Sequence, residues 1–168
     1  MQEANQRNQP NRDRGIQVIL THENADFDAI ASLLAAHKLY TSATPVLPHR
    51  VNRNVRAFLS LYGSRFSLVE PDAINRKARI DRIILVDTQK LSKFREMSQD
   101  VSQVLVIDHH TPPESPPENW RCQCETLGAA TTLLVEALST RLIPTSPIEA
   151  TLMLAGEMLS KIMDEAKP

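Results

Sequence analysis

Three short apolar segments constrain the fold of this chain more than any other feature of its sequence. They are residues 16–20 (IQVIL), 82–86 (RIILV) and 103–107 (QVLVI). Each is rich in β-branched residues and lacks strict alternation of apolar and polar positions, which is typical of strands buried on both faces. Such strands occur in parallel sheets, because the helices that connect parallel strands cover the sheet.

Helical segments separate these strands along the chain. The spacing of apolar residues predicts helices over residues 26–40 and 52–62, another that follows residues 127–130 and ends near 138, and a last one over 148–162. Weaker strands are predicted over residues 44–47, 66–69 and 121–125. The alternation predicts an α/β fold, a Rossmann-like three-layer sandwich with a mainly parallel sheet of about five strands.

Length and composition fit one domain. Of the 168 residues, 1–14 are polar throughout and are expected to form a disordered arm, with the domain over 15–168. The net charge of −1 gives the whole chain no general attraction for nucleic acid, although a local basic face stays compatible with it. No apolar run approaches the ~20 residues that span a bilayer, and no secretory signal precedes the domain, so we expect a cytoplasmic protein without a membrane partner.

Acidic and imidazole side chains follow each of the three strongest strands. They are His22, Asp26 and Asp28 after the first, Asp87 after the second, and Asp108, His109 and His110 after the third. Ligands of open α/β sheets bind at the carboxyl ends of the strands. So many carboxylates need compensating charge there, and mixed carboxylate and imidazole ligands suit Mn²⁺, while Mg²⁺, Co²⁺ or Zn²⁺ would also be accepted.

Each residue alone also has a simpler explanation. An aspartate at a helix start is more often an N-cap than a ligand, Asp87 alone would be a loop residue, and a pair of histidines is usually solvated. Their occurrence together at three strand ends favours the metal site. Asp26 and Asp28 can project to different sides of a turn, so that Asp87 bridges two ions ~3.5–4 Å apart.

The same residues carry a family resemblance. Residues 21–32 (THENADFDAIAS), 84–89 (ILVDTQ), 108–110 (DHH) and 128–138 (GAATTLLVEAL) resemble, in order, the motifs of the DHH phosphoesterase superfamily. That superfamily includes RecJ-like nucleases, nano-RNA and cyclic-dinucleotide phosphodiesterases and manganese pyrophosphatases. The resemblance extends over about residues 16–156.

The resemblance implies a role for each matched residue. His22 and Asp26 would hold one ion, Asp28 and His109 a second, and Asp87 both, the expected cofactor being two Mn²⁺ (or Mg²⁺) ions. The DHH motif implies the catalytic residues Asp108, His109 and His110. His110 would face the substrate phosphate together with the helix start at Gly128 and Ala129, whose free N–H groups suit an anion.

The chain departs from the family pattern near its end. Residues 150–156 (ATLMLAG) resemble a family helix that runs into a segment of the type G-I-Y-x-D-T-G, whose aspartate completes the second metal site. Here Gly156 is followed by EMLSKIMDEAKP, in which neither Glu157 nor Asp164 matches that pattern. We therefore expect a DHH domain truncated at its C-terminal end, without the DHHA1-type substrate-binding domain.

The implied function is metal-dependent hydrolysis of phosphodiester or phosphomonoester bonds in nucleic acid or nucleotides. Two alternatives remain open: a catalytically incomplete module that binds nucleotide or RNA, and a hydrolase similar to manganese pyrophosphatases. In detail the motifs look most like the DHH domain found ahead of CBS domains and a poly(A)-polymerase-type tRNA nucleotidyltransferase. That resemblance implies a connection with tRNA processing and further domains as partners in a longer protein.

Overall fold

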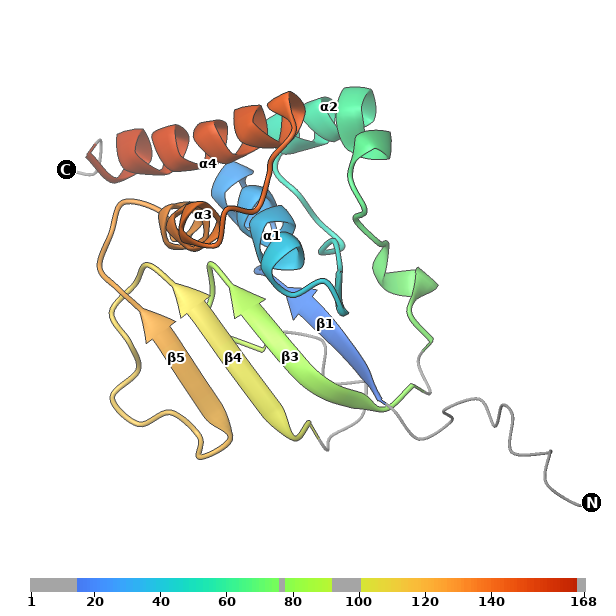
Figure 1. The fold of residues 1–168 in the computed structure, drawn as a ribbon, viewed down its shortest axis with the longest axis vertical. Helices are drawn as coiled ribbons and strands as arrows, with labels where there is room; N and C mark the ends of the chain where they lie inside the picture. The colour runs from blue at the N-terminus through green and yellow to red at the C-terminus, as the bar shows by residue number, and fades with distance from the viewer. Residues whose placement is uncertain (1–14, 76–77, 92–100, 166–168) are drawn as a thin grey trace, which may run out of the picture.

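A five-stranded, all-parallel sheet organises the molecule (Figure 1). The computed structural model describes residues 15–75, 78–91 and 101–165; the arm predicted over residues 1–14 lies outside them. The strand order is β2-β1-β3-β4-β5. The strands are β1 (Ile16–Leu20), β2 (Ala43–Pro45), β3 (Ile80–Val86), β4 (Gln103–Asp108) and β5 (Trp120–Cys124). This confirms the predicted α/β fold with a parallel sheet of about five strands.

The three central strands are buried on both faces, as their composition predicts. Alternate residues of each strand enter two separate apolar clusters. In β4, for example, Leu105 and Ile107 belong to the cluster beneath the helices, while Val104 and Val106 belong to the cluster on the opposite face. This two-sided burial fixes the register, because a shift by one residue would exchange the faces of every side chain.

Helices α1 (Phe27–Leu39) and α3 (Ala130–Thr140) cover one face of the sheet (Figure 1). Helix α4 (Pro147–Glu165) packs against these two helices. Helix α2 (Arg53–Tyr62) joins the same cluster through Phe58, whose ring meets Phe27 edge-on at 5.7 Å. Among the described residues, no helix combines the length and apolar composition that crossing a lipid bilayer requires.

The opposite face of the sheet is covered differently. In the described part of the chain, the side chains that pack there from outside the strands come from loops, among them Val69, Ile74 and Leu91. Trp120, the single tryptophan of the chain, joins this cluster at the first residue of β5. The half-buried indole therefore lies at the end of its strand opposite to Cys124, the last residue of β5.

One predicted strand is wrong. Residues 66–69 form only an isolated bridge between Val69 and Val46. A 3-10 turn (Gly63–Arg65) precedes the segment and a second (Pro71–Ala73) follows it, so too few residues remain for a strand. Gly63 caps α2 as expected, but with a right-handed φ of −56°, because the chain continues directly into the first of these turns.

Gly156 lies where α4 meets α1 and α3. A Cβ atom at this position would lie 2.9 Å from the Ala31 Cβ, 3.0 Å from the Phe27 carbonyl oxygen and 3.1 Å from the Thr131 Oγ1. The first two atoms belong to the backbone or are attached directly to it, so they cannot rotate away. The glycine therefore allows the close approach of these helices.

We predict that Gly156→Ala lowers the free energy of unfolding by about 1–2 kcal/mol, since overpacking outweighs the gain of about 1 kcal/mol in helix propensity. Gly63→Ala is the matched control, because a Cβ there would meet only Leu59 side-chain atoms, at 3.7 Å or more. The control should be neutral or slightly stabilising. Urea unfolding measures both, and a Gly156→Ala variant at least as stable as Gly63→Ala would contradict this account.

Candidate metal centre

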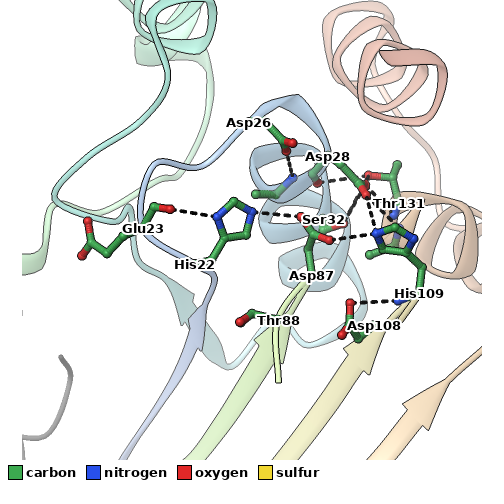
Figure 2. Close-up of polar contacts among 12 residues, drawn as sticks. His22, Glu23, Asp26, Asp28, Ser32, Asp87, Thr88, Asp108, His109 and Thr131 are labelled. Carbon is green, nitrogen blue, oxygen red and sulfur yellow. Dashed lines mark hydrogen bonds and ion pairs between the residues drawn. The ribbon is translucent and has the colours of Figure 1, made fainter. Parts of the chain in front are cut away.

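The predicted ligand residues meet at the carboxyl edge of the sheet, in the segments that follow β1, β3 and β4, with Asp28 in the first turn of α1 (Figure 2). They line a cleft of about 550 Å³, which we call the metal cleft. Its lining includes all seven side chains of the predicted cluster: His22, Asp26, Asp28, Asp87, Asp108, His109 and His110. The topology therefore brings together side chains that are far apart in the sequence.

Asp87 occupies the centre of the cluster. It follows β3 directly and adopts a left-handed φ of 54°, a conformation that aspartate and asparagine tolerate better than most residues. One carboxylate oxygen (Oδ2) lies 3.2 Å from the His22 Nε2, and the other (Oδ1) lies 3.4 Å from the His109 Nε2. With 7% of its surface exposed, the carboxylate bridges two imidazoles in a nearly closed environment.

Both imidazoles are oriented by the backbone. The His22 Nδ1 lies 2.9 Å from the Glu23 carbonyl oxygen, and the His109 Nδ1 lies 3.0 Å from that of Leu127. A carbonyl oxygen only accepts, so each Nδ1 carries a proton and donates it. In the neutral ring, the Nε2 lone pair then points to Asp87, which is the usual arrangement of a metal-ligating histidine.

Asp87 and the two histidines stabilise each other's charged forms. Hydrogen bonding to Asp87 raises the pKa of both His22 and His109 to about 9, against the opposing effect of burial. Burial also opposes ionisation of Asp87, but the hydrogen bonds from the two histidines outweigh it and lower the pKa of the carboxyl. A divalent cation would replace the two imidazole protons as the compensating charge.

Asp26 combines two of the roles considered for it. It is the N-cap of α1, because its Oδ1 accepts from the Ala29 N–H at 3.1 Å. Its exposed carboxylate also offers a ligand atom within 4.8 Å of ligand atoms on His22 and Asp87. The structure thus assembles the three residues assigned to the first ion, whose role as ligands remains a prediction.

Asp28 lines the metal cleft, with its Oδ2 3.9 Å from the His109 Nε2, but its carboxylate also binds the start of α3. Its Oδ2 accepts from the Ala130 N–H at 2.9 Å, and its Oδ1 accepts from the Thr131 N–H at 2.8 Å and the Thr131 hydroxyl at 2.6 Å. The carboxylate caps the start of α3, where free N–H groups and the helix dipole favour a negative charge. Burial, and then the charge of Asp87, raises the pKa of Asp28 to about 6.

This cap changes what surrounds Gly128 and Ala129. Ala129 is fully buried, and neither residue lines the metal cleft. The free N–H groups at the start of α3 meet an internal carboxylate instead of an outside anion. Nothing in this geometry supports the phosphate-binding role predicted for the two residues.

The DHH motif divides into buried and exposed parts. Asp108 is 1% exposed, and its Oδ1 accepts from the His109 N–H at 2.9 Å and lies 3.0 Å from the His110 Nδ1. His110, by contrast, exposes 62% of its side chain in the metal cleft. Ligand atoms of Asp87, Asp108, His109 and His110 lie within 4.8 Å of one another, so this group is a second candidate for a metal.

Sequence reasoning missed several polar residues of the site. Ser32 and Thr131 surround Asp28, with 3.2 Å between their hydroxyl oxygens. The loop after Asp87 adds Gln89, whose Nε2 donates to the Thr111 carbonyl oxygen at 3.0 Å, and Lys90. The signal for Gln89 and Lys90 was their place directly after a strand-end aspartate. Thr131 lies within the quoted motif of residues 128–138, but nothing in that motif indicates a contact with Asp28.

Helix α4 occupies the region where the family pattern leads to another carboxylate. It continues without interruption from Pro147 to Glu165, and it places Ser160 in the lining of the metal cleft. Glu157 forms an ion pair of 2.9 Å with Lys161 and does not line this cleft. The side chain of Asp164 lies outside the described residues.

We predict that the free energy of unfolding of the metal-free chain falls as the pH rises from 6.5 to about 9. The unfolded histidines lose their protons near 6.5, whereas folded His22 and His109 keep theirs to about 9, so alkaline pH favours unfolding. Asp87→Asn removes the charge that retains these protons and should flatten the profile. Urea unfolding in the presence of chelator tests this, and a flat profile in the unsubstituted chain would contradict it.

Two curated proteins are similar to this chain. The A-adding tRNA nucleotidyltransferase of Geobacter sulfurreducens is 31% identical over 144 residues, and that of Aquifex aeolicus is 28% identical over 141 residues. Each match covers 83% of this chain but 16% of the relative, so the chain spans about a sixth of the length of these proteins.

Solved structures share the fold. A putative family II inorganic pyrophosphatase from Methanococcus jannaschii has a TM-score of 0.65, and an exopolyphosphatase-related protein from Bacteroides fragilis has one of 0.60. Both are 23% identical; each match covers 89% of this chain, and 50% and 47% of the respective neighbour. A family model for the N-terminal domain of the DHH family matches residues 17–157. The chain therefore belongs to the DHH family.

Proposed function

We propose that this chain is a divalent-metal-dependent phosphoesterase domain that hydrolyses phosphodiester or phosphomonoester bonds in nucleic acid or nucleotides. The observation that carries the proposal is the bridging carboxylate of Asp87 between the Nε2 atoms of His22 and His109. Both rings donate through Nδ1 to backbone carbonyl oxygens. A solvated or purely structural histidine does not require both a backbone acceptor at Nδ1 and a shared carboxylate at Nε2.

The donor set fits a divalent metal. His22, Asp26 and Asp87 offer two carboxylates and one imidazole around one position, and His109 offers a further imidazole across Asp87. Imidazole nitrogen with carboxylate oxygen suits Mn²⁺ better than Mg²⁺, which prefers oxygen ligands. Bound there, the ions would supply activated water and neutralise the charge of the phosphate.

His110 is proposed to act on the reacting phosphate. Its Nδ1 donates to the buried Asp108, which leaves the Nε2 of an exposed ring in the cleft. In its protonated form, His110 can donate a proton or a hydrogen bond from Nε2 to a phosphate or leaving-group oxygen. Asp108 then acts as a positioning residue, because it holds the ring and the backbone of the motif.

Lys90 supplies a further positive charge. Among the described lining residues of the metal cleft, it is the only lysine or arginine. Gln89, its neighbour, donates to the Thr111 carbonyl and so ties the loop after β3 to the loop after β4. An ammonium group on this loop suits a phosphate oxygen.

The relatives extend the proposal to a biological context. Both similar curated proteins are named A-adding tRNA nucleotidyltransferases, and we propose that this chain serves in the cytoplasm as the DHH domain of a protein of that kind, with RNA as its partner. The similarity is confined to about a sixth of their length, so the nucleotidyl transfer itself is not attributed to this chain.

A second candidate is a binding module without catalytic activity. The observation that favours it is the engagement of Asp28 with the start of α3, together with the uninterrupted course of α4. Both features weaken the second metal position relative to the first. Mn²⁺ binding accompanied by hydrolysis distinguishes the phosphoesterase from the binding module.

We predict that Asp87→Asn abolishes Mn²⁺ binding in calorimetry and slows hydrolysis of bis(p-nitrophenyl) phosphate by at least about 100-fold, because one carboxylate serves both positions. Asp81→Asn is the matched control. Asp81 lies in β3, the strand that Asp87 follows, and pairs with Arg79 at 2.9 Å instead of lining the cleft. The control should bind Mn²⁺ and hydrolyse the ester like the unsubstituted chain. Normal Mn²⁺ binding by Asp87→Asn would reject the proposed site. If the unsubstituted chain binds Mn²⁺ but does not hydrolyse the ester, the result would favour the binding module.

We also predict two Mn²⁺ binding steps, one at least about tenfold weaker than the other. Asp28→Asn should remove the weaker step and leave the tighter one, because Asp28 is not part of the His22, Asp26 and Asp87 group. His22→Ala should remove the tighter step. Thermal unfolding of each variant verifies that the fold persists, and loss of both steps in Asp28→Asn would contradict this assignment.

A further inference from the structure

A second cleft, of about 480 Å³, adjoins the metal cleft. The two share four lining residues: His22, Asp26, Asp28 and Ser160. The remaining lining comes from the loop before α1 and from α1, α2 and α4: Glu23, Asn24, Phe27, Asn52, Asn54 and Leu159. We call it the amide cleft, after its three asparagines. Its size is ordinary for a small-molecule site, and a ligand with its phosphate in the metal cleft can extend into it.

The asparagines present hydrogen-bonding groups of both kinds. The Asn52 Oδ1 caps α2 by accepting from the Val55 N–H at 2.8 Å, which leaves its NH₂ group for a ligand. Asn24 and Asn54 have no side-chain hydrogen bond to any described residue. The Asn24 backbone is held at a φ of 61° by a hydrogen bond of 2.9 Å from its N–H to the Arg50 carbonyl oxygen. Such amides pair well with the edges of heterocyclic bases.

Two apolar side chains, Phe27 and Leu159, also line the amide cleft. Phe27 is half-buried and held edge-on by Phe58, so its ring is fixed before a ligand arrives. Leu159, on α4, is 43% exposed. An aromatic ring with an aliphatic neighbour suits a base by stacking, which is tolerant of base identity.

The charges of the amide cleft disfavour a chain of phosphates. No lysine or arginine is among its described lining residues, while the carboxylates of Glu23, Asp26 and Asp28 are. The Glu23 Oε2 accepts only from the Arg50 backbone N–H, at 3.2 Å, so its charge is not neutralised by a side chain there. Asp26 and Asp28 are proposed metal ligands, but the Glu23 carboxylate would still repel a second phosphate group in this cleft, where no lysine or arginine side chain among the described lining residues compensates it.

We propose that the amide cleft is a nucleoside subsite, so that the substrate is a phosphate ester of a nucleoside and not inorganic pyrophosphate or polyphosphate. The base lies against Phe27 and hydrogen-bonds to Asn24 and Asn54. The inference rests on the proposed function, because the metal cleft positions the phosphate next to this subsite.

The test is a binding measurement that does not require hydrolysis. The full chain, loaded with diamagnetic Mg²⁺ and labelled with ¹⁵N, is titrated with adenosine monophosphate, inorganic phosphate or inorganic pyrophosphate. Only the nucleotide should shift the side-chain NH₂ resonances of Asn24 and Asn54. Asn54→Ala should raise the Kd for adenosine monophosphate about fivefold, the loss of one hydrogen bond, and leave the Kd for phosphate unchanged.

Ser60→Ala is the matched control, since Ser60 is an exposed residue of α2 outside both clefts. Its Kd for the nucleotide should equal that of the unsubstituted chain. Equal Kd values for nucleotide and phosphate, or pyrophosphate that binds more tightly and shifts Asn24 and Asn54, would overturn the subsite. Absence of hydrolysis with selective nucleotide binding would reject only the proposed catalysis, and hydrolysis without selective binding would reject only the subsite.

Discussion

The ion-pair bridge through Asp87 is the interaction on which the site depends. It joins the ends of β1 and β4 through one residue at the end of β3, and it places a nearly buried carboxylate between two imidazoles. Without compensation, a charge in such a position would be costly. The left-handed backbone at Asp87 adds a second restriction, because few residues adopt it without strain. Charge, burial and backbone geometry thus all favour aspartate here.

The sheet was predictable because its evidence is local. The uninterrupted apolar composition of β1, β3 and β4 indicates burial on both faces, and parallel strands necessarily bring their carboxyl ends to one edge, which is enough to group His22, Asp87 and His109. The environment of Asp28 was not predictable. Its partners on α3 are 102 and 103 residues away, and no pattern around either segment indicates that an aspartate caps a distant helix. The strand expected at residues 66–69 failed for the converse reason, because its composition is suitable but the turns on both sides leave it too short.

The helices determine which parts of the edge are accessible. Helix α1 presents Asp26 at its capped start, α3 is anchored to Asp28, and α4 closes one side with Ser160. A sheet of this kind supports many chemistries, and those of the neighbours with a similar fold are not transferable by fold alone. The division of the edge into a cleft rich in ligand groups and a cleft rich in amides is a property of this chain's own loops.

The position of Trp120 has a practical consequence for spectroscopy. The single indole packs on the face of the sheet opposite α1 and α3, at the start of β5, while the ligand residues follow the other ends of the strands. Four residues of strand, roughly 13 Å, separate Trp120 from the edge of the sheet where the ligand residues lie. Its intrinsic fluorescence is therefore a selective reporter of the integrity of the sheet. A red shift of its emission would therefore report unfolding of the sheet and not occupancy of the metal cleft.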